Sequence, residues 1–188
     1  MRDKCILPFL ITERLEFFQL TQADLPELEI LLGETEIMYA WEHGFTKIES
    51  QAWLNENLRR YSSDGYSYWA VRKKNDGSLI GVMGILKEVA EGKQYIGIGY
   101  ILNKKYWGQG YAGEGTEALC QYAFRKLQLQ TLTAQGRTNN FASQHIAEGL
   151  GMKAMCNFVK IYRGQEMPHF LYTLDRDKWL KTTSNGTV

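Results

Sequence analysis

The segment Trp107-Gly108-Gln109-Gly110-Tyr111-Ala112-Gly113-Glu114 is the most informative part of this sequence. It lies between a predicted strand that ends at Leu102 and an amphipathic helix predicted over residues 112–127. Glycines let such a turn curl tightly so that successive N–H groups point inward, and the start of the helix adds partial positive charge. A segment of this kind binds phosphate oxygens, although a plain strand-to-helix connection is the simpler alternative.

Residues 108–113 also match the G-x-G-x-x-G fingerprint of dinucleotide-binding enzymes. That fingerprint follows its strand directly and is followed by an acidic residue about 20 positions later. Here residues 103–107 intervene, and no Asp or Glu lies between Glu117 and Glu148. The roughly 75 residues that remain cannot build the parallel βαβ units of a doubly wound sheet. A dinucleotide-dependent oxidoreductase is therefore the least favoured function.

The hydrophobic pattern around this segment predicts about seven strands and about four helices in the order βααβββαβαββ. This order indicates an α+β fold with a mixed sheet. Thr46 and Glu49 form a capping box, Asn75-Asp76-Gly77 supplies the positive-φ residues of a tight hairpin, and Gly151 fits the left-handed position after a helix. The strands are expected at residues 14–20, 67–72, 78–86, 95–102, 129–136, 155–162 and 167–174, and the helices at 25–33, 46–61, 112–127 and 141–150.

Length and composition fit one ordinary globular domain over residues 1–188, with a core from about 12 to 179 and a short tail at each end. The three cysteines, Cys5, Cys120 and Cys156, are odd in number and far apart, which is typical of a reducing cytoplasm. No apolar run approaches the about 20 residues of a membrane helix, and residues 1–10 lack the pattern of a secretion signal. We therefore expect a cytoplasmic protein that does not bind membranes.

The net charge of +1 argues against a general nucleic-acid binder, but the charge is distributed unevenly. Residues 1–60 hold six Lys or Arg and eleven Asp or Glu, whereas the rest of the chain has an excess of basic residues. The simpler interpretation is that each run of like charges is ordinary solvated surface charge. The alternative is that a cationic ligand lies near the early part and an anionic ligand on the later part.

Residues 107–112 resemble the pyrophosphate loop of the GNAT superfamily of acyl-CoA N-acyltransferases, whose pattern is Gln/Arg-x-x-Gly-x-Gly/Ala. Trp107 replaces the first residue, as in the branch that includes ribosomal-protein N-terminal acetyltransferases. The resemblance extends over residues 12–179, and its motifs follow the family's order. These motifs are Thr12-Glu13-Arg14-Leu15, Trp69-Ala70-Val71, Leu79-Ile80-Gly81, Gly99-Tyr100-Ile101-Leu102, Asn140-Phe141-Ala142-Ser143 and Leu150-Gly151-Met152.

The resemblance implies a single-domain GNAT-like fold whose mixed, mostly antiparallel sheet is splayed where the cofactor binds. The pantetheine arm of acetyl-CoA would lie beside the strand at 95–102, where Gly97 and Gly99 fit a distortion. No metal is implied. The residues expected to bind the cofactor are Tyr100, Ile101, Leu102, Trp107, Gly108, Gln109, Gly110, Tyr111, Ala112, Gly113 and Asn140, with Lys104 or Lys105 near a phosphate.

The implied reaction is direct transfer of an acyl group to a neutral amine. Ser143 matches a family position that protonates the departing thiolate, although Asn140 and Ser143 also fit a simple helix cap. Relatives often carry a Glu where this chain has Gly97, so the base is not assigned, and Glu42, His43 and water are all options. Trp41, Glu42 and His43 are expected to border the acceptor site.

The predicted function is that of an acetyl-CoA-dependent N-acetyltransferase whose acceptor is a protein N-terminus, a polyamine or another small amine. The acidic early segment favours a cationic acceptor. The alternative is an acyl-CoA-binding module without turnover, which the missing acid at Gly97 makes a serious competitor. We expect no direct nucleic-acid binding, and a homodimer is left as an option.

Overall fold

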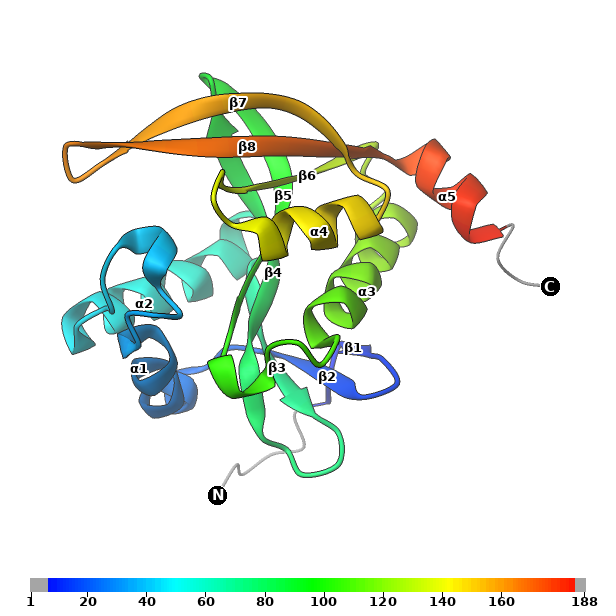
Figure 1. Ribbon diagram of the computed structural model, residues 1–188. Coiled ribbons are helices and arrows are strands. Elements are labelled where there is room, and N and C mark those ends of the chain that lie inside the picture. Colours follow the sequence, from blue (N-terminus) through cyan, green and yellow to red (C-terminus); the bar gives the residue numbers. More distant parts are fainter. Residues whose placement is uncertain (1–6, 185–188) are drawn as a thin grey trace. The chain divides into compact units, whose positions relative to one another are not determined.

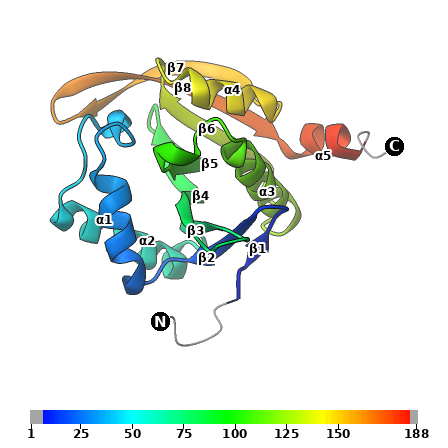
Figure 2. The ribbon, with the colours of Figure 1, turned by 60° about the horizontal axis from the view of Figure 1, so that its bottom comes forward.

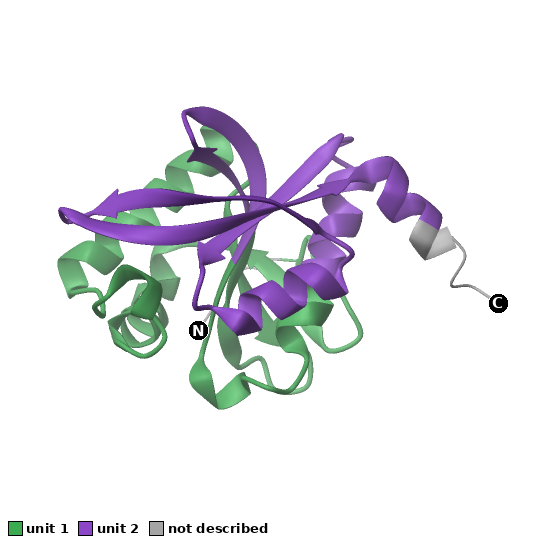
Figure 3. Ribbon diagram, turned by 45° about the horizontal axis from the view of Figure 1, so that its top comes forward, with its two compact units in different colours: residues 1–84, 100–115 green, residues 85–99, 116–188 purple. Residues whose placement is uncertain are grey.

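The computed structural model describes residues 7–184, and side chains through residue 181, so Cys5 and the terminal tails lie outside the described residues. The chain forms two compact units (Figure 3). The first unit contains residues 1–84 and 100–115, and the second contains residues 85–99 and 116–188. Strands β4 (Leu79–Ala90) and β5 (Lys93–Leu102) and helix α3 (Tyr111–Arg125) contribute to both units.

The first unit combines antiparallel strands with two helices that lie side by side, α1 and α2 (Figure 2). Leu28 and Leu32 of α1 and Leu54 of α2 are fully buried, as their helical spacing predicts. The elements that lie wholly in this unit are β1 (Leu10–Ile11), β2 (Leu15–Gln19), η1 (Gln22–Asp24), α1 (Leu25–Gly33), η2 (Tyr39–Trp41), α2 (Lys47–Ser63), β3 (Tyr68–Lys73) and η3 (Lys104–Tyr106).

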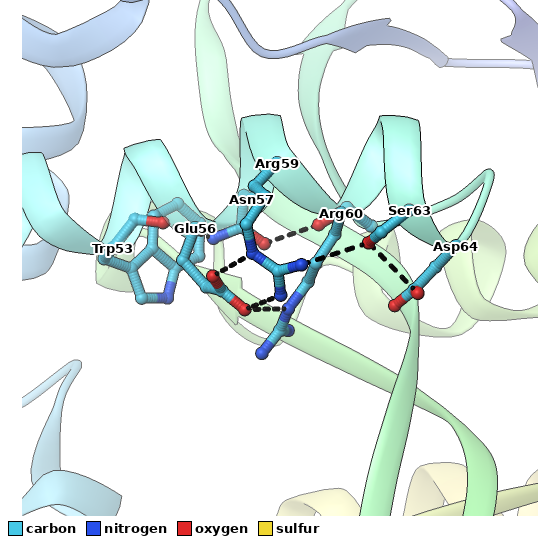
Figure 4. A network of polar contacts seen from close by, with 8 residues as sticks. Trp53, Glu56, Asn57, Arg59, Arg60, Ser63 and Asp64 are labelled. Carbon is cyan, nitrogen blue, oxygen red and sulfur yellow. Dashed lines mark hydrogen bonds and ion pairs between the residues drawn. The ribbon is translucent and has the colours of Figure 1, made fainter.

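A polar network runs along one side of α2 (Figure 4). Glu56 accepts two hydrogen bonds of 2.8 Å from the Arg59 guanidinium and one of 2.9 Å from Arg60. Asn57 turns inward, where its amide donates to the Trp53 carbonyl and accepts a 2.7 Å bond from the buried Ser67 hydroxyl. The helix therefore has a charged outer side and a satisfied polar contact in the core.

The second unit is built around a long hairpin of β7 and β8 (Figure 1). Its two-residue turn, Arg163-Gly164, has φ values of 51° and 78°, as a type I′ turn requires. Trp179 of the last helix is buried, with its ring centroid 5.5 Å from that of Phe124. The elements that lie wholly in this unit are β6 (Thr131–Arg137), α4 (Phe141–Gly149), β7 (Lys153–Tyr162), β8 (Gln165–Asp175) and α5 (Arg176–Ser184).

The hydrogen-bonded strand order is β1-β2-β3-β4-β5-β6-β8-β7. Among the described residues the one parallel pair is β5 with β6, where Gly97 lies opposite Thr133. The mixed, mostly antiparallel α+β prediction is confirmed, and this order excludes a doubly wound parallel sheet. The eighth strand is the short β1, and the fifth α-helix is α5, which carries little apolar sequence besides Trp179 and so was not predicted.

Most turn predictions hold, and one needs correction. Of the segment Asn75-Asp76-Gly77, only Gly77 has a positive φ (70°), because the chain makes a longer turn closed by the Gly77 N–H and the Lys73 carbonyl at 2.9 Å. Gly151 has a φ of 79°, and the Met152 N–H returns to the Ala147 carbonyl at 3.0 Å, as predicted for the end of α4. The domain bounds of 1–188 and 12–179 stay predictions.

Gly115 positions the start of α3 within the first unit. A Cβ atom on this glycine would lie 2.2 Å from Sδ of Met83 and 3.3 Å from the ring of Phe17. Both neighbours are fully buried strand residues. The helix therefore starts directly against β2 and β4, and the segment before it is held at the surface of this packed layer.

Candidate acyl-CoA site

The glycine-rich segment before α3 is a surface turn whose backbone requires glycine at two positions. Gly108 and Gly110 have φ values of 69° and 80°, in the left-handed region that other residues rarely adopt. Within residues 7–184, the N–H groups of Gly108, Gln109, Gly110 and Tyr111 donate no hydrogen bond to the protein. Four successive N–H groups without a protein acceptor, at the N-terminus of a helix, form an anion-binding arrangement.

Gly113, in the first turn of α3, is the second sign of a close ligand approach. A glycine inside a helix costs about 1 kcal/mol relative to alanine, so its presence calls for a reason. A Cβ atom on Gly113 would have no neighbour within 4 Å, so packing against the described residues does not demand glycine there. The residues of this turn thus fit a diphosphate that approaches the backbone closely.

The turn is braced by Arg14, at the start of β2. Its guanidinium donates to the Gln109 carbonyl at 3.0 Å and to the Glu114 carboxylate at 2.6 Å, and lies 4.3 Å from the centre of the Tyr111 ring. Glu114 also accepts hydrogen bonds from the Thr12 hydroxyl at 2.5 Å and the Arg14 N–H at 2.8 Å. Burial alone would raise the pKa of Glu114, but the hydrogen bonds from Thr12 and Arg14 lower it, so the carboxylate stays charged.

Sequence reasoning found the Thr12-Glu13-Arg14-Leu15 motif but not this brace. The residues that it joins lie about 100 positions apart, and no local pattern pairs them. One further contact shapes the other side of the turn, where the Gln109 side chain donates to the Lys105 carbonyl at 2.8 Å. The turn is therefore preorganised from both ends.

The strand residues before the turn occupy a constrained part of the first unit. A Cβ atom on Gly81, whose φ is 152°, would lie 2.2 Å from the Ile101 carbonyl oxygen, so β4 and β5 approach unusually closely. The Leu102 carbonyl accepts a 2.9 Å bond from the Trp107 indole. Tyr100 lies on the same strand and is half-buried. Trp107 thus fixes the path of the chain from the strand into the turn.

The two lysines proposed near a phosphate are already engaged by protein groups. Lys104 forms an exposed ion pair with Glu36, with Nζ 2.6 Å and 2.7 Å from the carboxylate oxygens. The Lys105 ammonium lies 4.7 Å from the centre of the Tyr106 ring. Exposed contacts of this kind are weak, so both lysines can exchange them for a phosphate.

The predicted acceptor residues lie in the loop between α1 and α2 of the first unit. Glu42 is exposed and has a φ of 63°. The ring of His43 lies between the Trp41 carbonyl, 2.8 Å from Nδ1, and the Glu49 carboxylate, 3.0 Å from Nε2. Both ring nitrogens of His43 thus contact groups of the loop and of the start of α2. The Trp41 ring packs edge-on against the Phe45 ring, with the ring centroids 6.2 Å apart.

Asn140 and Ser143 lie at the start of α4 in the second unit. The Asn140 side chain accepts a 3.1 Å bond from the Ser143 N–H, so it caps the helix as the sequence predicts. The structure therefore gives Asn140 a capping role at the start of this helix. Within the described residues no cluster of three or more His, Cys, Asp or Glu side chains could hold a metal ion. No helix of the described part is long and apolar enough to cross a bilayer.

Comparisons with known proteins agree with this geometry. The profile of the acetyltransferase (GNAT) domain matches residues 14–153. YkkB of Bacillus subtilis, described as an uncharacterized protein, is 29% identical over 164 residues, covering 87% of this chain and 93% of its own.

Solved structures show the same fold. A GNAT-family acetyltransferase from Bacillus anthracis has a TM-score of 0.77 at 22% identity, covering 89% of this chain and 98% of its own. RimL, described as a ribosomal L7/L12 alpha-N-protein acetyltransferase in complex with coenzyme A, has a TM-score of 0.73 at 17% identity, covering 88% of this chain and 96% of its own. Since the family profile covers most of its length, this chain belongs to the GNAT family of acetyltransferases.

Proposed function

We propose that the turn at residues 107–113 binds the diphosphate of acetyl-CoA and that the chain transfers the acetyl group to a cationic primary amine. The observation that carries this proposal is the set of four amide groups from Gly108 to Tyr111 that have no partner within the described residues. Tyr100, Ile101 and Leu102 are proposed to contact the pantetheine through their backbone, and Asn140 through its side chain. Acetyl-CoA supplies an activated acyl group.

The acceptor is proposed to be a protein N-terminus or a polyamine. The acidic character of residues 1–60 supports a cationic acceptor, and the loop of Trp41, Glu42 and His43 is proposed to border it. The description of RimL as an N-terminal protein acetyltransferase favours the protein N-terminus as the first acceptor to test. A cytoplasmic location and a homodimer stay predictions.

Ser143 is proposed to protonate the thiolate of CoA as it leaves. Its hydroxyl can donate a proton, and its N–H is already committed to the Asn140 cap. Ser143→Ala should lower kcat while the dissociation constant for acetyl-CoA stays the same. An unchanged kcat would remove Ser143 from the mechanism.

Calorimetry and thiol release test the proposed function together. Coenzyme A should bind. Pantetheine has no diphosphate, so the N–H groups of the turn would have no anion to bind, and its affinity should be at least about tenfold weaker. Release of free thiol from acetyl-CoA is then measured with N-terminal peptides, polyamines and amino acids. Binding without amine-dependent release across this panel would favour the non-catalytic acyl-CoA-binding module.

A further inference from the structure

A cluster of cationic and aromatic side chains lies next to the acyl-CoA turn in the first unit. Lys105 belongs to η3, directly before the turn, and Lys73 is the last residue of β3. Their ammonium groups lie 4.7 Å and 5.9 Å, respectively, from the centre of the same ring, that of Tyr106. Two cations from separate elements therefore converge on one aromatic ring beside the turn.

Direct contacts join this cluster to the N–H groups of the turn. The Gln109 side chain donates to the Lys105 carbonyl at 2.8 Å, which holds η3 against the turn. The Tyr106 ring lies edge-on to the Tyr111 ring, with the ring centroids 6.1 Å apart. Because Tyr111 supplies the last of the four N–H groups, the fold of the first unit fixes where the two cations lie relative to the turn.

Carboxylates balance the positive charge of this cluster only in part. The Lys73 ammonium forms an ion pair of 3.1 Å with Asp76, and this hydrogen bond is the main cause of its raised pKa. Among residues 7–184, the Lys105 ammonium makes no ion pair, and the Tyr106 ring is its neighbour. A lysine ammonium has three N–H donors, so each of the two can bind an anion while it stays near the ring.

From this arrangement, we infer that Lys105 and Lys73 bind the 3′-phosphate of coenzyme A. The inference rests on the proposed binding of acyl-CoA at the turn, and it assigns a second anion site to the same ligand. The four N–H groups of the turn bind the diphosphate, which a single ribose joins to the 3′-phosphate. A phosphate monoester carries a charge of about −1.5 to −2 at pH 7, so two neighbouring ammonium groups match its charge.

The expected consequence is a preference for coenzyme A over dephospho-coenzyme A. The two ligands share the pantetheine, the diphosphate and the adenosine, and they differ only in the 3′-phosphate. Lys105 is exposed and Lys73 is half-buried, so water and salt weaken each contact with the phosphate. We therefore expect a preference of about tenfold, which should decrease as the salt concentration rises.

Calorimetry of the full chain with coenzyme A and with dephospho-coenzyme A tests this assignment. Lys105→Gln and Lys73→Gln should each reduce the wild-type preference by at least about threefold. The double variant should bind the two ligands with affinities within about twofold of each other. The matched control is Lys47→Gln, which removes an exposed ammonium 3.8 Å from the Glu29 carboxylate at the start of α2 and should keep the wild-type preference.

A variant with an expected gain separates this assignment from a general loss of stability. Asp76→Asn removes the negative charge that competes for the Lys73 ammonium. It keeps a side-chain oxygen that can accept from the Ser78 N–H, as Asp76 does at 2.9 Å. The preference for coenzyme A should therefore rise by about two- to threefold. An unchanged preference in this variant would remove Lys73 from the site.

Two other results would overturn the assignment as a whole. The first is equal affinity of the wild type for coenzyme A and dephospho-coenzyme A. The second is a wild-type preference that persists in the double variant but is lost in Lys104→Gln, because the neighbouring lysine would then bind the 3′-phosphate. Absence of binding by both ligands would instead reject the proposed function, since dephospho-coenzyme A retains the diphosphate.

Discussion

Helices α2 and α3 both have their N-termini in the first unit, but they differ in whether their first N–H groups have hydrogen-bond acceptors within the protein. At α2, Thr46 and Glu49 form a capping box, with the Thr46 N–H donating to Glu49 at 2.8 Å and the Glu49 N–H to Thr46 at 3.2 Å. At α3, residues 108–111 offer their amides to no group of the described protein. The capping box satisfies the first N–H groups of α2 with side chains of the protein, whereas the N–H groups before α3 lack a protein acceptor and can donate to an external anion.

The largest effect is expected from replacing a glycine in the open turn. Gly110→Val forces a β-branched residue into a φ of 80° and places its side chain about where Arg14 approaches, since a Cβ atom would lie 3.4 Å from that guanidinium. The strain costs about 1–3 kcal/mol and distorts the amide array. Coenzyme A should bind at least about 30-fold more weakly in calorimetry.

Gly65→Val is the matched control for that experiment. Gly65 follows α2, has a φ of 82°, and would carry a Cβ atom with no neighbour within 4 Å. The backbone strain is the same, but no amide of the turn is involved. Equal loss of coenzyme A affinity in the two variants would mean that the Gly110 effect is a general loss of stability.

The second expected effect concerns the brace that keeps the turn of α3 open. Arg14→Ala removes the bonds to the Gln109 carbonyl and to Glu114, and leaves that carboxylate with fewer donors. A hydrogen bond to a charged group contributes about 1.5–3 kcal/mol, and only part of this loss weakens the conformation of the turn that binds the ligand. We therefore expect coenzyme A affinity to fall about tenfold.

Arg59→Ala is the control for the brace. Arg59 also makes a two-pronged contact with a carboxylate, Glu56, but on the outer side of α2 (Figure 4). It should change coenzyme A affinity by less than about twofold, because an exposed pair contributes little. An Arg14→Ala protein with wild-type affinity would show that the turn holds its shape without the brace.

The same comparison explains what could be predicted from sequence. Both helix starts are local patterns, so the capping box of Thr46 and the glycine turn before α3 were readable, and their positions in the structure agree. The contact of Thr12 with Glu114 and the approach of Glu88 to Gly97 are not local. They depend on which strands are neighbours and on register, which one sequence does not specify.

A third prediction separates capping from ligand binding. Thr46→Ala removes the acceptor of the Glu49 N–H and should lower the free energy of unfolding by about 1 kcal/mol without changing coenzyme A affinity. Asn140→Ala removes the corresponding cap of α4 and should cost a similar amount. If Asn140 also contacts pantetheine as proposed, only its variant will bind coenzyme A more weakly. Denaturant unfolding and calorimetry measure the two quantities, and equal affinities would leave Asn140 with a capping role alone.

The smallest expected effect is a pH dependence at the closed helix start. The backbone hydrogen bond from Thr46, followed by the bond to His43, lowers the pKa of Glu49 from 4.5 to about 2. A carboxylate with a lowered folded-state pKa stabilises the protein above its unfolded pKa, and that contribution is lost as the pH falls. The stability difference between wild type and Glu49→Gln should therefore shrink between pH 4.5 and about 2 in urea titrations. A difference that stays constant over this range would mean that the Glu49 charge contributes nothing to the cap, and the contrast with α3 would then depend on the Thr46 hydroxyl alone.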